Sequence, residues 1–278
     1  MPRHRRSILI TGASRGIGAH LAQDLAASGH TVFAASRSGD RPETDRGAPN
    51  VTPVAMDVTD EVSVELAIAS IGDLDAVICN AGVGWFAPME IMSERSFERT
   101  IATNLVGAVR VIRHALPALR RSGDGRVIAI SSLSAVSGLP GESAYCASKA
   151  GLEAAMESLR YEVEPLGVKI SIVQPGYTAD SGLVVSGRAP GTPNGTVYEP
   201  LLARNDAGHD TLRNGAESPQ LICDAVQESL SLSEPRFRYP LGALAPVAAS
   251  LKAASDDHVH ATIADMFGVA DWAAEVTA

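Results

Sequence analysis

Short apolar runs recur along the chain at intervals that a helix can fill, and they predict its strands. Most of them are almost continuously apolar rather than alternating, which is typical of strands buried on both faces of a parallel sheet. The last run is more polar and is predicted to close one edge of that sheet. The predicted strands are 7–11, 31–36, 51–56, 74–79, 126–131, 168–173 and 236–241.

The stretches between these runs have helical periodicity. In the first stretch Leu21 and Leu25 lie four positions apart, and Gly29 is a typical stop signal. Regular alternation of strands and helices predicts an α/β fold, with a doubly wound, mostly parallel sheet of about seven strands and helices on both faces. Helices are predicted at 18–29, 60–72, about 93–119 and about 143–164, with another in the Ala-rich tail after residue 243.

One segment interrupts this alternation. Residues 178–217 are rich in Gly, Pro, Asn and Thr and have weak periodicity. Forty such residues inside a compact domain are typical of a functional lid or a mobile loop. The chain has no internal repeat, so we predict one domain over 1–278 with a substrate loop or lid inserted at 178–217.

Composition narrows the class of protein. The 278 residues are 45% hydrophobic and 20% charged, as in an ordinary soluble globular protein, and the net charge of −9 argues against a nucleic-acid partner. No apolar run approaches ~20 residues, so no membrane span is expected, and the basic start resembles no secretory signal. Cys79, Cys146 and Cys223 are scattered without metal-ligand spacing, which fits a cytoplasmic protein without a metal site.

A glycine-rich turn follows the first predicted strand and leads directly into a helix. Its sequence is TGASRGIG, with Gly12, Gly16 and Gly18 allowing a sharp turn and a close backbone approach. The helix N-terminus offers free N–H groups and a partial positive charge to a pyrophosphate. Because the turn lies between a buried strand and a helix, the pattern favours nucleotide binding over a merely structural turn.

The end of the second strand indicates which dinucleotide binds. NAD-binding proteins of this type usually place an acidic residue there to hold the ribose hydroxyls. This chain has Arg37 instead, with Arg15 in the glycine turn as a second cation. A guanidinium pairs with a 2′-phosphate in bidentate fashion, so we predict NADP(H) over NAD(H). The alternative is that both arginines are simply solvated.

Tyr145 and Lys149 lie four positions apart among small residues, in the sequence SAYCASKAG. On a helix they share one face. A nearby ammonium favours the phenolate, so we expect Lys149 to lower the pKa of Tyr145 toward a useful range for proton transfer. The alternative is a surface tyrosine beside a lysine whose stem packs on the protein.

Other polar residues follow predicted strands at the edge where a ligand crevice opens. Ser131 and Ser132 end the fifth strand, and the spacing to Tyr145 favours Ser132 as the reactive hydroxyl. The sequence CNAG follows the fourth strand, and its small residues suit close approach to a cofactor. Asn104 lies inside a predicted helix, where asparagine is a mediocre helix former, which indicates a special role.

Together these features resemble the short-chain dehydrogenase/reductase family, which implies a Rossmann-type fold. The matching motifs are TGASRGIG at 11–18, DV at 57–58, NAG at 80–82, Asn104, Ser132, YCASK at 145–149 and PG at 175–176, in family order across about 7–180. Within the family, YCASKAGLE and RYPLGA look most like the hydroxysteroid- and retinol-dehydrogenase branch.

The resemblance implies roles for individual residues. Tyr145 would be the general acid or base, Lys149 would hold the nicotinamide ribose, and Ser132 would orient the carbonyl. Asn104 would keep a water in a proton relay; tying neighbouring elements together is the alternative. The implied cofactor-binding residues, which include Asp57 as either an adenine contact or a turn cap, are Gly12, Ser14, Arg15, Gly16, Ile17, Gly18, Arg37, Asp57, Val58, Asn80, Ala81, Gly82, Tyr145, Lys149, Pro175, Gly176 and Thr178.

The predicted function is an NADP(H)-dependent oxidoreductase that interconverts a secondary alcohol and a ketone or aldehyde on a lipophilic small molecule. The alternatives are a sugar-nucleotide epimerase or dehydratase and a non-catalytic NADP(H)-sensing regulator. The apolar segments 182–187 and 134–143 are expected on the walls of the site, with Trp85 and Phe86 either there or in the core. The resemblance also implies a homodimer or homotetramer formed through the two long helices.

Overall fold

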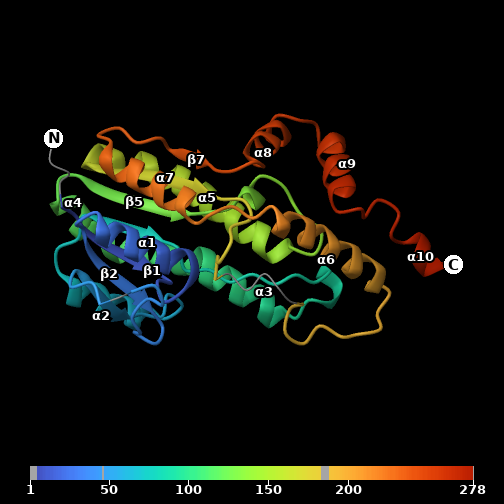
Figure 1. The fold of residues 1–278 in the computed structure, drawn as a ribbon, viewed down its shortest axis with the longest axis horizontal. Coiled ribbons are helices and arrows are strands. Elements are labelled where there is room, and N and C mark those ends of the chain that lie inside the picture. The colour runs from blue at the N-terminus through green and yellow to red at the C-terminus, as the bar shows by residue number, and fades with distance from the viewer. Residues whose placement is uncertain (1–4, 46, 183–187, 278) are drawn as a thin grey trace.

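The computed structural model describes residues 5–45, 47–182 and 188–277, and its centre is one sheet of seven parallel strands (Figure 1). The strand order is β3-β2-β1-β4-β5-β6-β7, and every adjacent pair is parallel. The predicted doubly wound sheet is therefore confirmed. The strands are β1 Ser7–Thr11, β2 Thr31–Ser36, β3 Val51–Ala55, β4 Ala76–Cys79, β5 Gly125–Ile130, β6 Val168–Gln174 and β7 Arg238–Pro240.

The apolar runs are continuous because each strand contributes to two cores. Successive side chains of a strand point to opposite faces. On β1, Ile8 and Ile10 pack in one buried cluster, whereas Leu9 between them packs in the other. A strand covered on both sides has no polar face, so the sequence cannot alternate.

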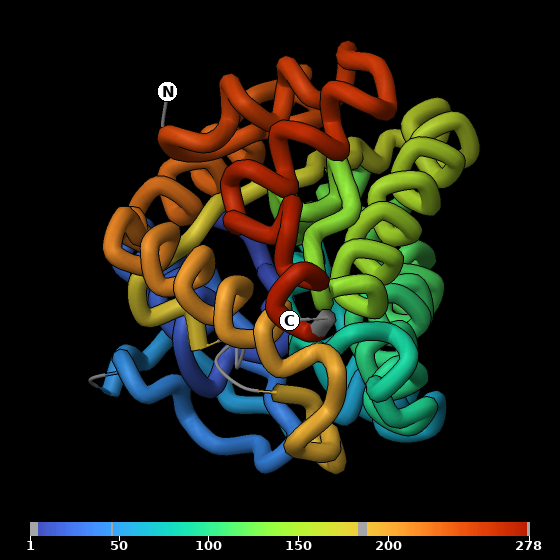
Figure 2. The backbone as a smooth tube through the Cα atoms, turned by 90° about the vertical axis from the view of Figure 1, so that its right-hand side faces the viewer, coloured from blue at the N-terminus to red at the C-terminus, as the bar shows by residue number. Residues whose placement is uncertain are grey.

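Helices cover both faces of the sheet, as Figure 2 shows with α5 and α7 on opposite sides. Side chains of α1 and α7 pack in one core, and side chains of α2, α4 and α5 in the other. The helices are α1 Gly16–Ala27, α2 Glu61–Ile71, α3 Glu94–Ile101, α4 Gly107–Arg121, α5 Ser143–Val163, α6 Glu199–Asn214, α7 Gln220–Ser231, α8 Ala245–Lys252, α9 Asp256–Met266 and α10 Ala274–Thr277, with 3-10 turns at Met89–Ile91, Leu133–Ala135 and Glu164–Leu166.

The long helical region predicted at 93–119 is present but not uniform. It consists of α3, a π-helical turn at Ala102–Val106, and α4. Ser93 caps the start, since its side chain accepts a hydrogen bond from the backbone N–H of Ser96. Wider π turns inside helices are frequent at functional sites, and this one contains Asn104.

Two parts of the fold differ from the sequence prediction. The segment 178–217 is not a loop throughout, because its second half forms the 16-residue helix α6. Weak periodicity concealed this helix, whose buried residues include the polar Asn205 and His209. The tail after residue 243 contains the predicted helix and differs only in having more of them, α8, α9 and α10. The division into one domain with an inserted lid stays a prediction.

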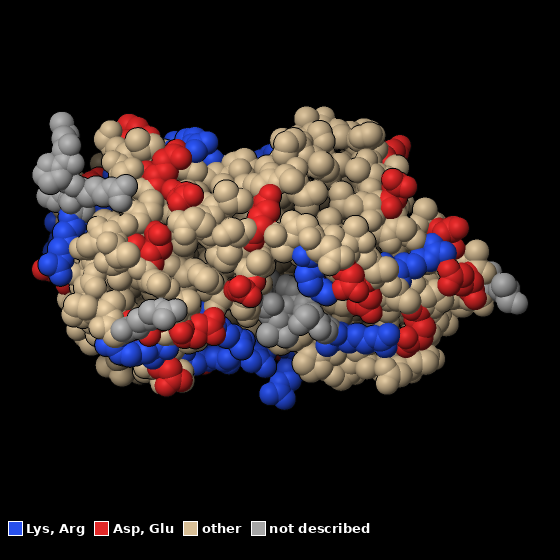
Figure 3. Space-filling view, in the orientation of Figure 1, with Lys and Arg blue, Asp and Glu red and all other residues tan. Residues whose placement is uncertain are grey.

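Charged side chains are distributed unevenly over the surface. In Figure 3 basic side chains gather along the lower edge, while acidic ones are scattered over the rest of that face.

Across the described ranges, no helix combines the length and apolar character that crossing a bilayer requires.

We expect Ile128→Ala on the central strand β5 to lower the free energy of unfolding by about 2–5 kcal/mol. Ile128 is fully buried and packs between strands and helices, so its removal leaves a cavity. Urea unfolding followed by circular dichroism measures the change. Leu66→Ala on α2 is the control, because Leu66 is 66% exposed; equal losses for both variants would contradict the assigned core.

Candidate active site

A pocket of about 1070 Å³ opens where the strands of the sheet end. Much of its lining comes from the loops after β1, β2, β3, β4, β5 and β6, as expected for the carboxyl edge of a parallel sheet, and helices supply the rest. Most predicted site residues line it; Gly16, Gly18 and Asn104 do not. The lining set is Gly12, Ser14, Arg15, Ile17, Arg37, Asp57, Val58, Asn80, Ala81, Gly82, Ser132, Tyr145, Lys149, Pro175, Gly176 and Thr178.

The glycines of the first turn are required by close contacts. Gly12 has a φ of +66°, and a Cβ there would lie 2.8 Å from the Cα of Ala81. A Cβ on Gly18 would lie 2.3 Å from the carbonyl oxygen of Gly12. Asn80 holds the turn from the neighbouring strand, since its Nδ2 donates to the carbonyls of Thr11 (3.0 Å) and Gly12 (3.2 Å). Gly18 therefore serves packing beneath the pocket rather than its surface.

The start of α1 directs N–H groups at oxygen acceptors. The N–H of Gly16 donates to Glu43 Oε1 at 2.8 Å, and the N–H of Ile17 donates to the Ser181 carbonyl at 3.2 Å. A helix N-terminus favours such acceptors and anions. Both donors are occupied in this structure, so a pyrophosphate would bind them only by replacing the Glu43 carboxylate and the Ser181 carbonyl.

Arginines gather at the same end of the pocket. Arg15 and Arg37, together with Ser14, Ser36 and Ser38, line a smaller adjoining hollow. Arg95 and Arg99 on α3 line the large pocket as well, and the sequence analysis did not identify them. This basic, hydroxyl-rich lining has the chemistry that a phosphate group requires.

Asp57 has two kinds of neighbours. Its Oδ1 accepts hydrogen bonds from Thr59 N (2.9 Å) and Thr59 Oγ1 (2.7 Å), so it caps the following turn. Burial raises the pKa of Asp57, but the Thr59 hydrogen bonds and the charges of Arg37 and Arg99 leave that pKa below its ordinary value. It is therefore a turn cap that also lines the pocket beside the arginines.

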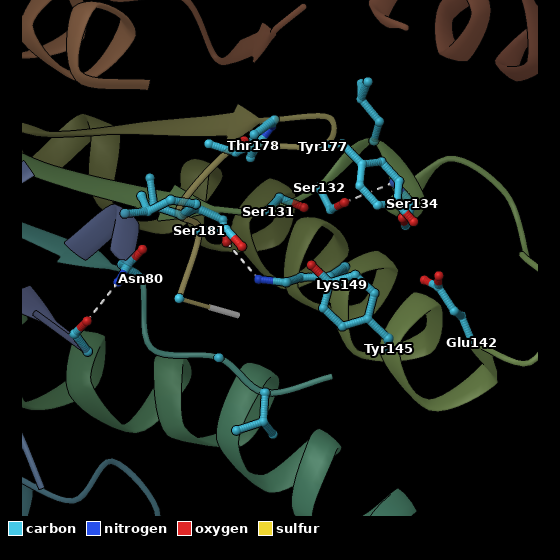
Figure 4. Close-up of a pocket in the computed structure, with 18 of the residues that line it drawn as sticks. Asn80, Ser131, Ser132, Ser134, Glu142, Tyr145, Lys149, Tyr177, Thr178 and Ser181 are labelled. Atoms are coloured by element: carbon cyan, nitrogen blue, oxygen red, sulfur yellow. Dashed lines mark hydrogen bonds between the residues drawn. The ribbon is translucent and has the colours of Figure 1, made fainter. Parts of the chain in front are cut away.

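Tyr145 and Lys149 lie on one face of α5 and line the same pocket, as their spacing predicts (Figure 4). Both residues are buried, at 7% and 5% exposure. The Lys149 Nζ donates to the carbonyl of Ile130 at the end of β5 (2.8 Å) and lies 5.8 Å from the centre of the Tyr145 ring. The helix and the strand end thus fix the two side chains independently.

The expectation that Lys149 lowers the pKa of Tyr145 is wrong for this structure. Burial is the largest effect and raises that pKa; the charge of Glu142 also raises it, and a side-chain hydrogen bond with Ser132 lowers it. Burial lowers the pKa of Lys149 to about 8, against the opposing charges of Glu153 and Cys79. The sequence shows the spacing of the pair but not its desolvation, which outweighs the pairing.

The two serines after β5 have different partners. Ser131 donates its hydroxyl to Glu153 Oε1 at 2.7 Å, and Gln174 Nε2 donates to the same oxygen at 2.9 Å. Ser132 instead accepts from the backbone N–H of Ser134 and interacts with the Tyr145 hydroxyl. Ser132 is therefore the serine placed at the phenol, as the spacing predicts.

Asn104 lies beneath the pocket and is 1% exposed. Its Oδ1 accepts from the N–H of Val83 (2.8 Å), and its Nδ2 donates to the Val83 carbonyl and to Ser148 Oγ (both 2.9 Å). The side chain thus ties the loop after β4 to α5. The water relay implied by the family resemblance stays a prediction.

The 134–143 segment lies on the wall of the pocket, as the sequence predicts, but its lining residues are mostly polar. They are Ser134, Ser137, Leu139 and Glu142. Of 182–187, Gly182 lines it, and 183–187 lie outside the described residues. Trp85 and Phe86 are not in the lining: Phe86 stacks on His209, and Trp85 lies against Arg99.

The C-terminal helices supply a wall that the sequence analysis missed. Apolar side chains of the 244–267 region reach the pocket, and no motif marks them because their role depends on how the tail folds back. They are Leu244, Val247, Ala248, Leu251, Ile263, Met266 and Phe267.

A group of buried polar residues at this side of the pocket was also missed. Glu142 and Tyr177 line the pocket, and His209 of α6 lies against both. Glu142 precedes Tyr145 by three positions, a helical spacing that could have marked it. The weakly periodic segment gave no signal for His209.

We expect the free energy of unfolding of wild type to rise with pH relative to Lys149→Met. Between pH 8 and 10.5 the unfolded chain holds a lysine proton that the folded chain lacks, because burial lowers the folded pKa of Lys149 to about 8. The difference between the two proteins should change by roughly 2–3 kcal/mol from pH 7 to 10.

Chemical unfolding across that range measures the effect, and comparing two proteins cancels the other titrating groups. Lys252→Met at the exposed end of α8 is the matched control and should show no such trend. A pH-independent difference for Lys149→Met would mean that the ammonium is not desolvated.

Comparisons with known proteins identify the family of this chain. The short chain dehydrogenase family model matches residues 6–189. A 3-ketodihydrosphingosine reductase of Bacteroides thetaiotaomicron is 33% identical, covering 86% of this chain and 89% of that protein. Human 17-beta-hydroxysteroid dehydrogenase type 1 is 32% identical, covering 84% and 77%. The crystal structure of a short chain dehydrogenase from Burkholderia cenocepacia in complex with NADP superposes with a TM-score of 0.76 at 26% identity, covering 95% and 99%. The chain belongs to the short-chain dehydrogenase family of oxidoreductases.

Proposed function

We propose that the protein is an NADP(H)-dependent oxidoreductase that interconverts a ketone or aldehyde and the corresponding alcohol on a lipophilic small molecule. The observation that carries this proposal is that the two ends of one continuous pocket carry different kinds of side chain. Ser132, Tyr145 and Lys149 converge at one end, and Arg15 and Arg37 line the other. Hydride chemistry at one end and phosphate recognition at the other is the pattern of a nicotinamide enzyme.

The proposed roles of the side chains follow from their protonation and contacts. Burial keeps the phenol of Tyr145 protonated, so in the direction of reduction it donates its proton to the carbonyl oxygen. The Ser132 hydroxyl donates a hydrogen bond to the same oxygen as negative charge develops on it. A bound nicotinamide supplies the hydride. In the reverse direction the phenolate form of Tyr145 accepts the proton of the alcohol and returns to the phenol.

The proposed role of Lys149 is cofactor binding rather than proton donation to the substrate. Its ammonium is fixed by the Ile130 carbonyl and would hold the nicotinamide ribose hydroxyls. The glycine turn, Asn80 and Arg37 would hold the rest of the dinucleotide, and Pro175, Gly176 and Thr178 would contact the nicotinamide side. Asn104 would position a water for proton return through Lys149.

Three observations support a lipophilic substrate and NADP(H). Apolar side chains from α8 and α9 form one wall of the pocket. Two relatives are named for a ketone on a sphingoid base and for hydroxysteroids. One structural neighbour holds NADP, and this chain has Arg37 where an NAD enzyme usually places an acid.

We further propose a cytoplasmic homo-oligomer. The two long helices α4 and α5 expose apolar side chains, among them Val106, Val109 and Tyr161 near or on these helices. Such exposed apolar residues suit association of copies through this face.

We expect Tyr145→Phe to lower kcat for ketone reduction by about 10²–10⁴-fold while NADPH binding persists, because only the proton donor is lost. NADPH oxidation with a panel of aliphatic and steroid ketones measures turnover, and NADPH fluorescence measures binding. Tyr198→Phe is the control, since Tyr198 lies outside the pocket. A kcat near wild type for Tyr145→Phe would remove its central role, and wild-type inactivity toward every carbonyl would favour a sensing regulator.

We expect Arg37→Asp to shift the ratio of kcat/KM values from NADPH toward NADH by at least about tenfold. An aspartate repels the 2′-phosphate and accepts hydrogen bonds from ribose hydroxyls. Steady-state kinetics with both cofactors measures the ratio, and Arg121→Asp at the distant end of α4 controls for the change in net charge. An unchanged ratio would mean that another group recognises the 2′-phosphate.

A further inference from the structure

Three polar side chains from distant parts of the sequence meet in the wall of the pocket. Glu142 lies at the start of α5, Tyr177 follows β6, and His209 lies on α6. Tyr177 Oη contacts Nδ1 of His209, and Nε2 of the same ring lies 3.1 Å from Glu142 Oε1. The arrangement is a carboxylate, an imidazole and a hydroxyl in sequence, and the hydroxyl belongs to a residue that lines the pocket beside Tyr145.

The imidazole is held rigidly. His209 is fully buried, stacked on Phe86 with ring centres 5.2 Å apart, and in edge contact with Phe267 at the same separation. Its Nε2 has no aligned hydrogen bond, although the Glu142 carboxylate is within reach. A buried polar nitrogen without a partner is costly, so a small turn of either side chain toward that carboxylate is favourable.

The Glu142 carboxylate does not serve as a helix cap. Glu142 occupies the N-cap position of α5, but its side chain accepts no capping hydrogen bond, and it is 3% exposed. Burial raises the pKa of Glu142 to about 7, and burial lowers the pKa of His209 to about 4. Slightly above neutral pH the pair is therefore an anionic carboxylate beside a neutral ring.

A neutral imidazole carries one proton, and its neighbours select which nitrogen holds it. A carboxylate can only accept, so Glu142 places the proton on Nε2 and leaves Nδ1 as an acceptor. The Tyr177 O–H then donates to Nδ1. The remaining lone pair of the Tyr177 oxygen is left as an acceptor, whereas the opposite tautomer would leave a donor.

We propose that Glu142 and His209 are positioning residues that fix the Tyr177 hydroxyl oxygen as a hydrogen-bond acceptor for a hydroxyl group that the substrate carries close to its reacting carbonyl. Tyr145 and Tyr177 both line the pocket, and the charge of Glu142 raises the pKa of each phenol. The preferred substrate class is therefore a hydroxyketone with an apolar chain. This inference rests on the proposed ketone reduction.

The kinetic test compares hydroxymethyl hexyl ketone with methyl hexyl ketone at pH 8, where Glu142 is ionised. Tyr177→Phe and Glu142→Gln should each lower the ratio of their kcat/KM values by about three- to tenfold, the effect of one lost hydrogen bond. The double variant should lower it no further than Tyr177→Phe alone, because Glu142 acts through Tyr177. Tyr198→Phe and Glu157→Gln, both outside the pocket, are matched controls.

An unchanged ratio in Tyr177→Phe, or additive losses in the double variant, would overturn the proposal. In wild type the ratio of kcat/KM values should fall on acidification, because Glu142 becomes protonated. The same fall in the Glu142→Gln variant would also overturn the proposal. Other titratable groups also face these three residues. They are Tyr145 and Cys146 on α5 and Asp210 and Arg213 on α6, and all of them are the same in wild type and Glu142→Gln.

A second measurement does not depend on turnover. NMR of isotopically labelled histidine nitrogens, with His209 assigned by its loss in His209→Asn, should show a neutral ring protonated on Nε2 at pH 8. A charged ring or a proton on Nδ1 would contradict the proposed hydrogen bonds from Glu142 through His209 to Tyr177. If wild type reduces neither ketone, the proposed function fails. If the His209 ring nevertheless has the expected tautomer, the proposed hydrogen bonds among Glu142, His209 and Tyr177 still stand.

Discussion

The site depends on an ammonium buried beside a phenol at the end of a central strand. Water stabilises the charge of a lysine better than a protein interior does. Lys149 is nevertheless buried, and its ammonium donates to the last carbonyl of β5. That carbonyl is fixed by the parallel pairing of β5 with β4 and β6. The lysine's position is thus set by the sheet, and α5 needs only to present Tyr145 one turn earlier.

Desolvation, rather than pairing, dominates the electrostatics of this pocket. It raises the pKa values of Tyr145, Tyr177 and Glu142 and lowers those of Lys149 and His209. Each shift favours the neutral form. Buried groups that favour their neutral forms suit a lipophilic substrate, but charged side chains also line the pocket, among them Asp57, Arg99 and Arg213.

Two different parts of the fold build the pocket. Strand ends and the glycine turn position the residues proposed for cofactor and proton transfer. The opposite wall is built from α6, α8 and α9, in the C-terminal third of the chain (Figures 1 and 2). Arg204 of α6 contacts Asp271 and Glu275 of the tail, so the elements of this wall also hold one another. This wall of the pocket therefore comes from the least periodic part of the sequence.

The sequence by itself determined the sheet, the flanking helices and the motif residues, because burial on two faces imposes continuous apolar strands and close backbone contacts impose glycine. It also favoured Ser132 over Ser131 by spacing. Tertiary structure alone decided that Asn104 ties two elements together and that Tyr145 is too buried for Lys149 to lower its pKa. It alone brought Glu142, Tyr177 and His209 together, since their contacts span up to 67 positions along the chain and leave no local pattern. Local periodicity records how one element meets its core, whereas desolvation and long-range contacts depend on where every other element lies.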